Sequence, residues 1–336
     1  MRGYVVLFAL ALIWGASFLF IKVGVEEMPP ATLVVLRLSF SVLTLLAIIA
    51  ARPSLAAGWR RYWRLGVVVG VVNNVIPFML ITWGEVRIAT GVAAILNATT
   101  PLFTVLLANW WPDSARESLT FRRGAGVALG FLGVAALVGP TILNVGGSSG
   151  RIIGELAVLV AAASYGVGAL LSRRFGGSAM LVGPITMQGS ALILTIPIAV
   201  ATGLPTHMPS AKALGAVITL GVMGTAVAYL LYFWLIRNVG ATRTIIVTYL
   251  LPCTALVWGA IFLKEMISWN ALAGLALVLV GTMVTNGTIG KRLFARREQA
   301  GVAVRPSYAV EPGRGSEMSL SSRRKGQAHE TGASRH

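Results

Sequence analysis

Long apolar runs separated by short polar segments occupy the chain from residue 4 to residue 289. Each run is close to the roughly 20 residues that an α-helix needs to cross the hydrocarbon core of a bilayer. The pattern therefore predicts ten membrane-spanning helices. They cover residues 4–24, 31–51, 65–83, 89–109, 124–143, 152–172, 181–202, 212–236, 243–264 and 270–289.

The chain also repeats itself at an offset of 151 residues. The aligned pairs include Trp14 with Tyr165, Lys22 with Arg173, Trp83 with Trp234, and Pro101 with Pro252. Each copy holds five spans, and a unit with an odd number of spans must return upside down. The predicted fold class is an all-α integral membrane protein of two inverted five-helix repeats, residues 1–143 and 152–289, followed by a disordered basic tail, residues 290–336. Because the first span has a counterpart in the second copy, we interpret it as a retained helix and not a signal peptide.

Composition and charge agree with a membrane protein. Apolar residues make up 56% of the 336, charged residues 12%, and the mean hydropathy is +0.79. The loops, N-terminus and tail on one side of the membrane carry 22 of the 28 Lys and Arg residues. The loops on the other side carry 5, and Arg37 lies inside a span. Since positive loops stay inside, both termini are predicted to be cytoplasmic and the protein to lie in the plasma membrane. The tail is expected to touch anionic lipid, and nucleic-acid binding is the weaker alternative.

The inventory of reactive side chains argues against an enzyme. The only histidines are His207, His329 and His336, and the chain has one aspartate, Asp113, and one cysteine, Cys253. These residues provide neither a zinc site, nor a Ser-His dyad, nor an aspartate-rich magnesium motif. No phosphate-binding loop is present, so no cofactor, metal or ATP is expected. Cys253 is either a packing residue or a cavity residue.

Polar side chains at the centre of two spans are the strongest functional signal, because such groups are costly in hydrocarbon unless they are satisfied or useful. They are Asn73, Asn74, Asn97, Thr99 and Thr100. Proline leaves the carbonyl four residues earlier without its helical donor. Pro77, Pro101 and Pro252 would thus free the carbonyls of Asn73, Asn97 and Thr248. We predict a polar cavity bounded by the third, fourth, eighth and ninth spans, with these prolines as helix breaks or hinges. The alternative is hydrogen bonding between neighbouring helices.

Charged and aromatic residues extend the set of cavity candidates. Arg37 in the second span, whose repeat mate is Gln188, could clamp a carboxylate or phosphate, or could snorkel outward and lock helices together. The aromatic residues could line the cavity or belong to packing and the interfacial belt. No carboxylate lies at the centre of a span, so no coupling ion is predicted. The candidates are Trp14, Arg37, Asn73, Asn74, Asn97, Thr100, Tyr165, Gln188, Thr225, Tyr229 and Thr248, with Tyr232 and Tyr249 as further aromatic residues.

Each copy ends in the same sequence of features: a proline-centred apolar helix, an acidic residue, and a helix with spaced glycines. In the first copy these are Pro101, Glu117 and Gly126 to Gly133, and in the second Pro252, Glu265 and Gly274 to Gly281. The chain in this respect resembles EamA-type members of the drug/metabolite transporter superfamily, over residues 4–289. Trp14-Gly15 and Arg37 also resemble features of that family's first and second spans. Three extra residues near Asp113 depart from the repeat and lengthen a loop.

The resemblance implies a secondary transporter that carries a small metabolite, amino acid-like or otherwise polar or amphipathic, or a drug, with export favoured over uptake. It further implies a bacterial inner-membrane location and a central cavity formed by spans one to four and six to nine. The fifth and tenth spans would be peripheral and are candidates for a homodimer contact, although Gly126 and Gly130 could equally serve packing within the chain. The alternative function is a non-transporting membrane sensor or assembly scaffold that uses the basic tail.

Overall fold

The protein is almost entirely helical in the part of the chain that the computed structural model describes, residues 2–111, 120–143, 149–176 and 178–289. Within these residues, eight helical segments are long and apolar enough to cross a membrane, and two shorter apolar helices cover Ile246–Phe262 and Trp269–Thr285. The chain is therefore a multi-pass membrane protein. The count of ten spans and their inverted arrangement stay predictions, and the predicted tail and Glu117 lie outside the described residues.

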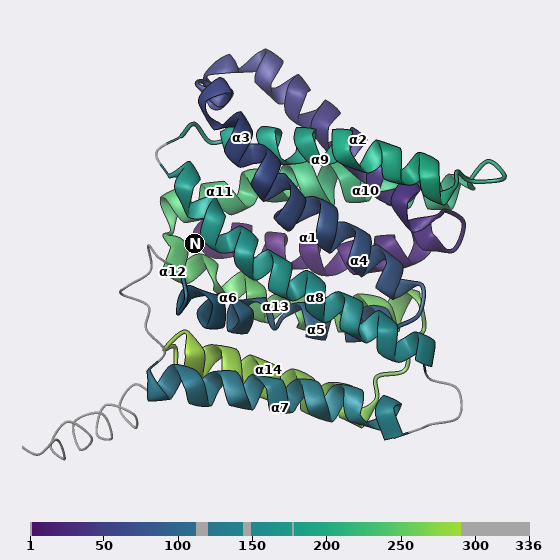
Figure 1. Ribbon diagram of the computed structural model, residues 1–336, viewed down its shortest axis with the longest axis vertical. Helices are drawn as coiled ribbons and strands as arrows, with labels where there is room; N and C mark the ends of the chain where they lie inside the picture. The colour runs from purple at the N-terminus through teal and green to yellow at the C-terminus, as the bar shows by residue number, and fades with distance from the viewer. Residues whose placement is uncertain (1, 112–119, 144–148, 177, 290–336) are drawn as a thin grey trace, which may run out of the picture. The chain divides into compact units, whose positions relative to one another are not determined.

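The helices run side by side across Figure 1. Those of the first copy are α1 (Arg2–Val25), α2 (Pro30–Ala51), α3 (Trp59–Gly70), α4 (Ile76–Glu85), α5 (Thr90–Asn97), α6 (Thr100–Ala108) and α7 (Phe121–Leu143). Those of the second copy are α8 (Ser149–Ser172), α9 (Val182–Thr202), α10 (Ala211–Gly221), α11 (Ala228–Asn238), α12 (Ala241–Thr244), α13 (Ile246–Phe262) and α14 (Trp269–Thr285). Short 3-10 helices cover Pro53–Ala56 and Arg173–Phe175, and π-helices cover Val71–Val75 and Val222–Val227.

The predicted third and eighth spans are each two α-helices joined by a π-helix, and the two π-helices begin 151 residues apart, at Val71 and Val222. In the first, the N–H of Ile76 reaches back five residues to the carbonyl of Val71. In that register the donor that Pro77 lacks would have served Val72, not Asn73 as predicted from α-helical spacing. The Ser164 hydroxyl donates to the Val72 carbonyl instead, at 2.6 Å, so a second helix satisfies the defect.

The predicted fourth span is broken at the expected place. Helix α5 ends at Asn97, α6 begins at Thr100, and Pro101 lies in the first turn of α6, where its missing N–H is tolerated. The Thr100 hydroxyl donates to the Asn97 carbonyl at 2.8 Å, which is the carbonyl that the proline leaves unpaired.

The second copy is broken elsewhere. Pro252 lies inside α13, which continues through it, and the helical chain is interrupted at Ile245. The Thr248 hydroxyl donates to the Ile245 carbonyl at 2.7 Å and so supports that earlier interruption. The predicted break at Pro252 is thus displaced toward the start of the helix.

Two glycines at repeat-equivalent positions allow the copies to pack closely on each other. A Cβ added to Gly70 would lie 2.6 Å from the carbonyl oxygen of Met187 in α9. A Cβ added to Gly221 would lie 2.7 Å from the carbonyl oxygen of Arg37 in α2. The third span of each copy thus packs against the second span of the other copy, backbone against backbone, at the start of its π-helix.

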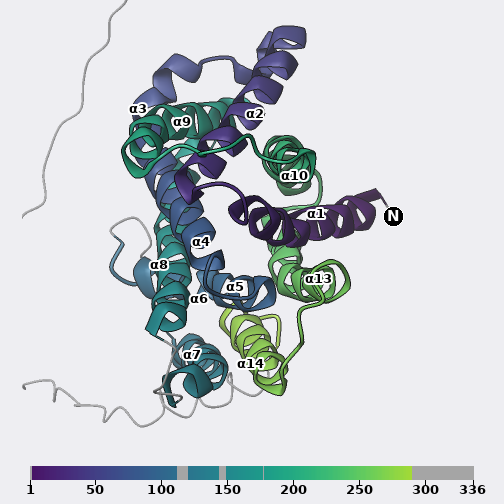
Figure 2. The same ribbon diagram turned by 90° about the vertical axis from the view of Figure 1, so that its right-hand side faces the viewer.

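Helices α7 and α14 lie side by side at one edge of the bundle in both views (Figures 1 and 2), and they pack extensively on each other. A Cβ at Gly133 would lie 2.8 Å from the Gly274 carbonyl oxygen, and one at Gly281 would lie 2.6 Å from that of Gly126. The spaced glycines of both copies therefore serve a close helix pair within the chain. Gly130 faces Leu102 of α6.

Candidate functional site

A cavity of about 680 Å³ lies among the helices. Its wall takes residues from α1, α2, the first π-helix with α4, α5, α6, α8, α9, the second π-helix with α11, and α13. These are the predicted spans one to four and six to nine. Among the described residues, α7 and α14 contribute nothing to the wall. A volume of this size matches the sites that hold small molecules in proteins.

Most of the residues singled out from the sequence meet on this wall, and others do not. The wall includes Trp14, Arg37, Asn73, Asn97, Thr100, Pro101, Tyr165, Tyr229, Tyr232 and Thr248. The residues that it does not include are Asn74, Pro77, Thr99, Gln188, Thr225, Tyr249, Pro252 and Cys253.

The cavity opens at the end of the bundle where the chain begins. Exposed residues on that side belong to the wall, among them Arg173 and Gly176 after α8 and Arg237 near the end of α11. At the opposite end the wall stops at Ile21 and Ile81, one turn before α1 and α4 end. Among the described residues, those of the wall that are exposed therefore lie at one end of the bundle only, which is the open end of the cavity.

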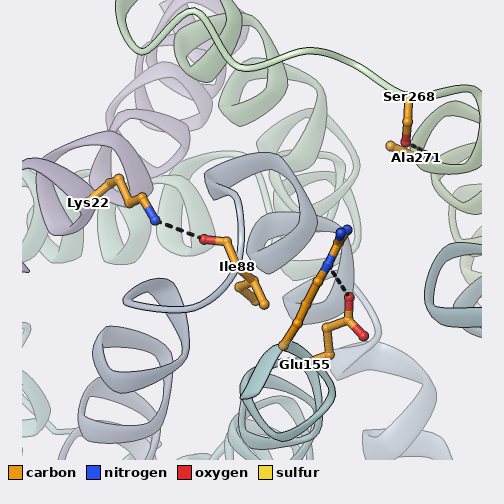
Figure 3. Close-up of polar contacts among 6 residues, drawn as sticks. Lys22, Ile88, Glu155, Ser268 and Ala271 are labelled. Carbon is orange, nitrogen blue, oxygen red and sulfur yellow. Dashed lines mark hydrogen bonds and ion pairs between the residues drawn. The ribbon is translucent and has the colours of Figure 1, made fainter. Parts of the chain in front are cut away.

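Polar contacts hold the closed end together. The Lys22 ammonium donates to the carbonyl oxygen of Ile88 at 3.1 Å (Figure 3). It also donates to the carbonyl oxygen of Glu85 at 2.6 Å, at the corner between α4 and α5. The Glu265 carboxylate accepts the backbone N–H of Thr90 at 2.9 Å, which caps the first turn of α5 from a distant segment. The two contacts tie α1 and the α13–α14 connection to the same corner.

Further contacts at this end order the helix starts. The side chain of Ser268 caps α14 by accepting the N–H of Ala271 at 3.2 Å (Figure 3). Glu155 of α8 is fully buried and forms an ion pair with Arg151, one turn earlier, at 3.3 Å. No group of three or more His, Cys, Asp or Glu side chains that could hold a metal gathers within the described part of the chain.

Arg37 is the most deeply placed charge on the wall, with 7% of its surface exposed. Its Nε donates to the Thr225 hydroxyl at 2.9 Å, and the guanidinium carbon lies 3.6 Å from the centre of the Phe78 ring. The Thr225 hydroxyl, in the second π-helix, in turn donates to the Leu220 carbonyl of α10 at 2.9 Å. Arg37 thus joins α2 to α4 and to the second π-helix while it faces the cavity.

Aromatic rings surround the open half of the cavity. The rings of Trp14 and Tyr232 lie 5.5 Å apart between centres, and those of Tyr232 and Phe233 lie 5.6 Å apart. The Asn73 amide donates to the Tyr229 hydroxyl at 3.4 Å. The side-chain oxygen of the wall residue Asn97 is buried and has no hydrogen-bond partner in the structure.

Two polar candidates that do not line the cavity, Gln188 and Asn74, are buried among the helices. Gln188 is fully buried and its side-chain oxygen accepts a hydrogen bond from Ser41 of α2. Asn74, next to the wall residue Asn73, is fully buried and its amide has no partner in the structure. Neighbouring positions of one helix therefore have different environments.

Several wall residues lacked a signal in the sequence. Phe78 and Phe233 are apolar residues in apolar runs, so nothing distinguished them from packing residues. Arg173 and Arg237 also line the cavity, but in the sequence they are basic residues of predicted loops. The alignment of Arg173 with Lys22 in the repeat is the one feature of the sequence that distinguishes Arg173.

The model of the EamA-like transporter family matches residues 1–139 and 152–287. The chain belongs to the EamA-like transporter family. A solved crystal structure shares its fold, with a TM-score of 0.61 at 20% identity, over 89% of this chain and 99% of the other. The family resemblance seen in the sequence is thereby confirmed.

Several similar proteins from different bacteria are named as transporters. An uncharacterized inner membrane transporter, YedA, of Escherichia coli K12 is 28% identical over 86% of this chain and 91% of its own. An uncharacterized transporter, YoaV, of Bacillus subtilis is 22% identical over 84% of this chain and 96% of its own. A probable terminal-alkyne amino-acid exporter of Streptantibioticus cattleyicolor is 27% identical over 85% of this chain and 93% of its own.

Proposed function

We propose that this EamA-like protein is a secondary transporter that moves a small polar or amphipathic metabolite across the plasma membrane by alternating access, and that it works as an exporter. The observation that carries the proposal is the cavity with one accessible end. It lies among the predicted spans one to four and six to nine, several of which are broken beside its wall. Broken helices around a central site are a common construction of secondary transporters.

Repeat-equivalent residues at opposite ends of the cavity support a mechanism in which two inverted halves rock about the centre. Lys22 holds the closed end, whereas its mate Arg173 lies on the wall at the open end. An exchange of these two environments would close one side and open the other. In this proposal Asn73, Asn97 and Thr248 face each side in turn.

The proposed direction is export. The predicted orientation puts the open end of the cavity in the cytoplasm, where an exporter loads its substrate. The relative from Streptantibioticus cattleyicolor is named as a probable exporter, which supports the same direction.

The test is untargeted mass spectrometry of the medium from cells that express the wild type or an Asn73→Ala/Asn97→Ala double variant at equal abundance in the membrane. Both side chains lie on the wall. A metabolite enriched outside only with the wild type would support export through this cavity. An unchanged medium with both correctly inserted proteins would contradict export.

Removal of the tail separates transport from a scaffold that acts through it. A chain that ends at residue 290 keeps all the residues that line the cavity. We expect it to export the same metabolite as the full chain, at equal membrane abundance. Loss of export with an intact, membrane-inserted bundle would favour a role for the basic tail.

A further inference from the structure

The charged groups on the cavity wall are all of one sign. Three wall residues among those described carry a full charge, and all three are arginines: Arg37, Arg173 and Arg237. No Asp or Glu belongs to the described wall. We infer that the substrate of this cavity is an organic anion, a carboxylate on an aromatic or similarly apolar body, with its carboxylate bound by Arg37. This inference rests on the proposed transport function and narrows its substrate.

Arg37 is held in a geometry suited to a carboxylate. The hydrogen bond to Thr225 uses Nε, at 2.9 Å, and Phe78 covers one face of the guanidinium. These contacts fix the plane of the group and leave its two terminal nitrogens, which form the fork that binds a carboxylate. A guanidinium this well buried also carries a large desolvation penalty, which an anion in the cavity would offset.

The rest of the wall selects the body of the substrate. Trp14, Tyr232 and Phe233 form a chain of rings in edge and tilted contact, 5.5 and 5.6 Å apart. Such rings favour a flat apolar ligand.

The positive charge at the open end of the cavity also favours an anionic substrate. Arg173 and Arg237 are exposed there and belong to the wall. Their field concentrates anions at the mouth of the cavity and repels cations. A cationic substrate would meet three arginines and no carboxylate, so the arrangement disfavours it.

The test is equilibrium binding to the full-length purified protein in nanodiscs, with three probes that share one aromatic body. They are 3-phenylpropanoate, 3-phenylpropanamide and 3-phenylpropylamine, which are an anion, a neutral amide and a cation at neutral pH. We expect the anion to bind at least about tenfold more tightly than the amide, because a hydrogen bond to a charged group is worth that much. The cation should bind most weakly.

Arg37→Gln should abolish the preference for the anion, and Arg37→Lys should retain part of it because the charge stays but the fork is lost. Arg87→Gln is the matched control. Arg87 also lies over an aromatic ring, at 3.7 Å from the centre of Trp83, but it is exposed and does not belong to the wall. This control should bind all three probes as the wild type does.

Equal binding of the amide and the anion by the wild type, or a preference that survives in Arg37→Gln, would overturn the inference. The comparison of probes on the wild type needs no variant, so it stands even if Arg37→Gln fails to fold. Binding of the anion without export of any metabolite would leave this inference standing and contradict the transport proposal. Export of a cationic metabolite would support the transport proposal and contradict this inference.

Discussion

Gly15 shows how closely α1 approaches α13. A Cβ at this position would lie 2.9 Å from both the backbone nitrogen of Ala255 and the Cβ of Thr254. The Thr254 hydroxyl also donates to the Ala11 carbonyl at 2.9 Å, so the two helices are joined by a hydrogen bond at the same level. Neither backbone can retreat without loss of that contact.

We therefore expect Gly15→Ala to lower the thermal stability of the purified protein, at about 1–3 kcal/mol for an overpacked site. Gly189→Ala is the control, because a Cβ there meets nothing within 4 Å and alanine favours the helix. Thermal unfolding in detergent measures both. A Gly15→Ala protein as stable as Gly189→Ala would show that the approach of α1 to α13 is looser than described.

Glu27, in the connection between α1 and α2, is bound by Ser210, the residue that caps α10. Its carboxylate accepts the Ser210 hydroxyl and the Ser210 backbone N–H, each at 2.6 Å. The hydrogen bond from the hydroxyl, and then that from the backbone, lowers the pKa of Glu27 below its ordinary value. The contact joins two helix ends at the closed side of the cavity.

Because its pKa is lower in the folded protein, Glu27 stabilises the fold fully above the pKa of the unfolded chain, and this contribution is lost as the pH falls through the folded value. We expect Glu27→Gln to lower the melting temperature slightly at neutral pH and to match the wild type only in acid, once the pH has fallen below the lowered pKa of Glu27 in the folded protein. Melting curves of both proteins over this range measure the effect. A difference that persists or grows in acid would contradict the role of the charged carboxylate.

For single residues, the sequence predicted which polar side chains are unusual but not which of them face the cavity. Asn73, Asn97 and Thr248 stood out because polar groups are rare at the centre of an apolar run, and all three lie on the wall. Asn74 and Gln188 gave the same signal but lie elsewhere, because the direction of a side chain depends on the turn of its helix. The π-helix at Val71–Val75 adds a residue to that turn, and no apolar window detects it.

At the scale of elements, α5 is a half-helix whose start depends on another segment. Its N-terminal N–H groups, those of Thr90 and Gly91, are accepted by Glu265 at 2.9 and 3.4 Å. A carboxylate at this end also interacts favourably with the helix dipole. The acidic residue that forms part of the family motif in the second copy thus stabilises a broken helix of the first copy.

Glu265→Ala should increase amide hydrogen exchange in residues 90–97. Loss of a helix cap costs about 1 kcal/mol, which corresponds to roughly fivefold faster exchange through local opening. Glu26→Ala, at an exposed acidic residue of the same side, is the control and should leave these amides unchanged. Equal exchange in both variants would mean that α5 is held by packing alone.

The sequence predicted most elements but not their interruptions. Window hydropathy located α1, α2, α7, α8 and α9 to within a few residues, since each is one continuous apolar helix. Pro101 marked the break between α5 and α6, whereas the break at Ile245 has neither proline nor glycine at the position itself. The contact that supports it, from the Thr248 hydroxyl to the Ile245 carbonyl, is one that threonine also makes in unbroken helices, so it gives no signal in the sequence.

At the scale of the whole molecule, the cavity opens at the end of the bundle that carries most of the basic residues. The end rich in arginine by sequence is the one where Arg173 and Arg237 belong to the wall. If positive residues mark the cytoplasmic side, the cavity in this structure opens to the cytoplasm. The orientation of the chain in the membrane is therefore the property on which the proposed loading step depends.

We expect single cysteines on a Cys253→Ala background to report this orientation. Met266, 95% exposed in the connection between α13 and α14, lies at the closed end, and Ala179 lies on the wall near the open end. A membrane-impermeant thiol reagent should label Met266→Cys in intact cells and Ala179→Cys only in inverted vesicles. The opposite pattern would reverse the orientation and make the open end a place where substrate enters from outside. Export would then have to begin from the other conformation, since a cavity open to the exterior is the state in which an exporter releases its substrate.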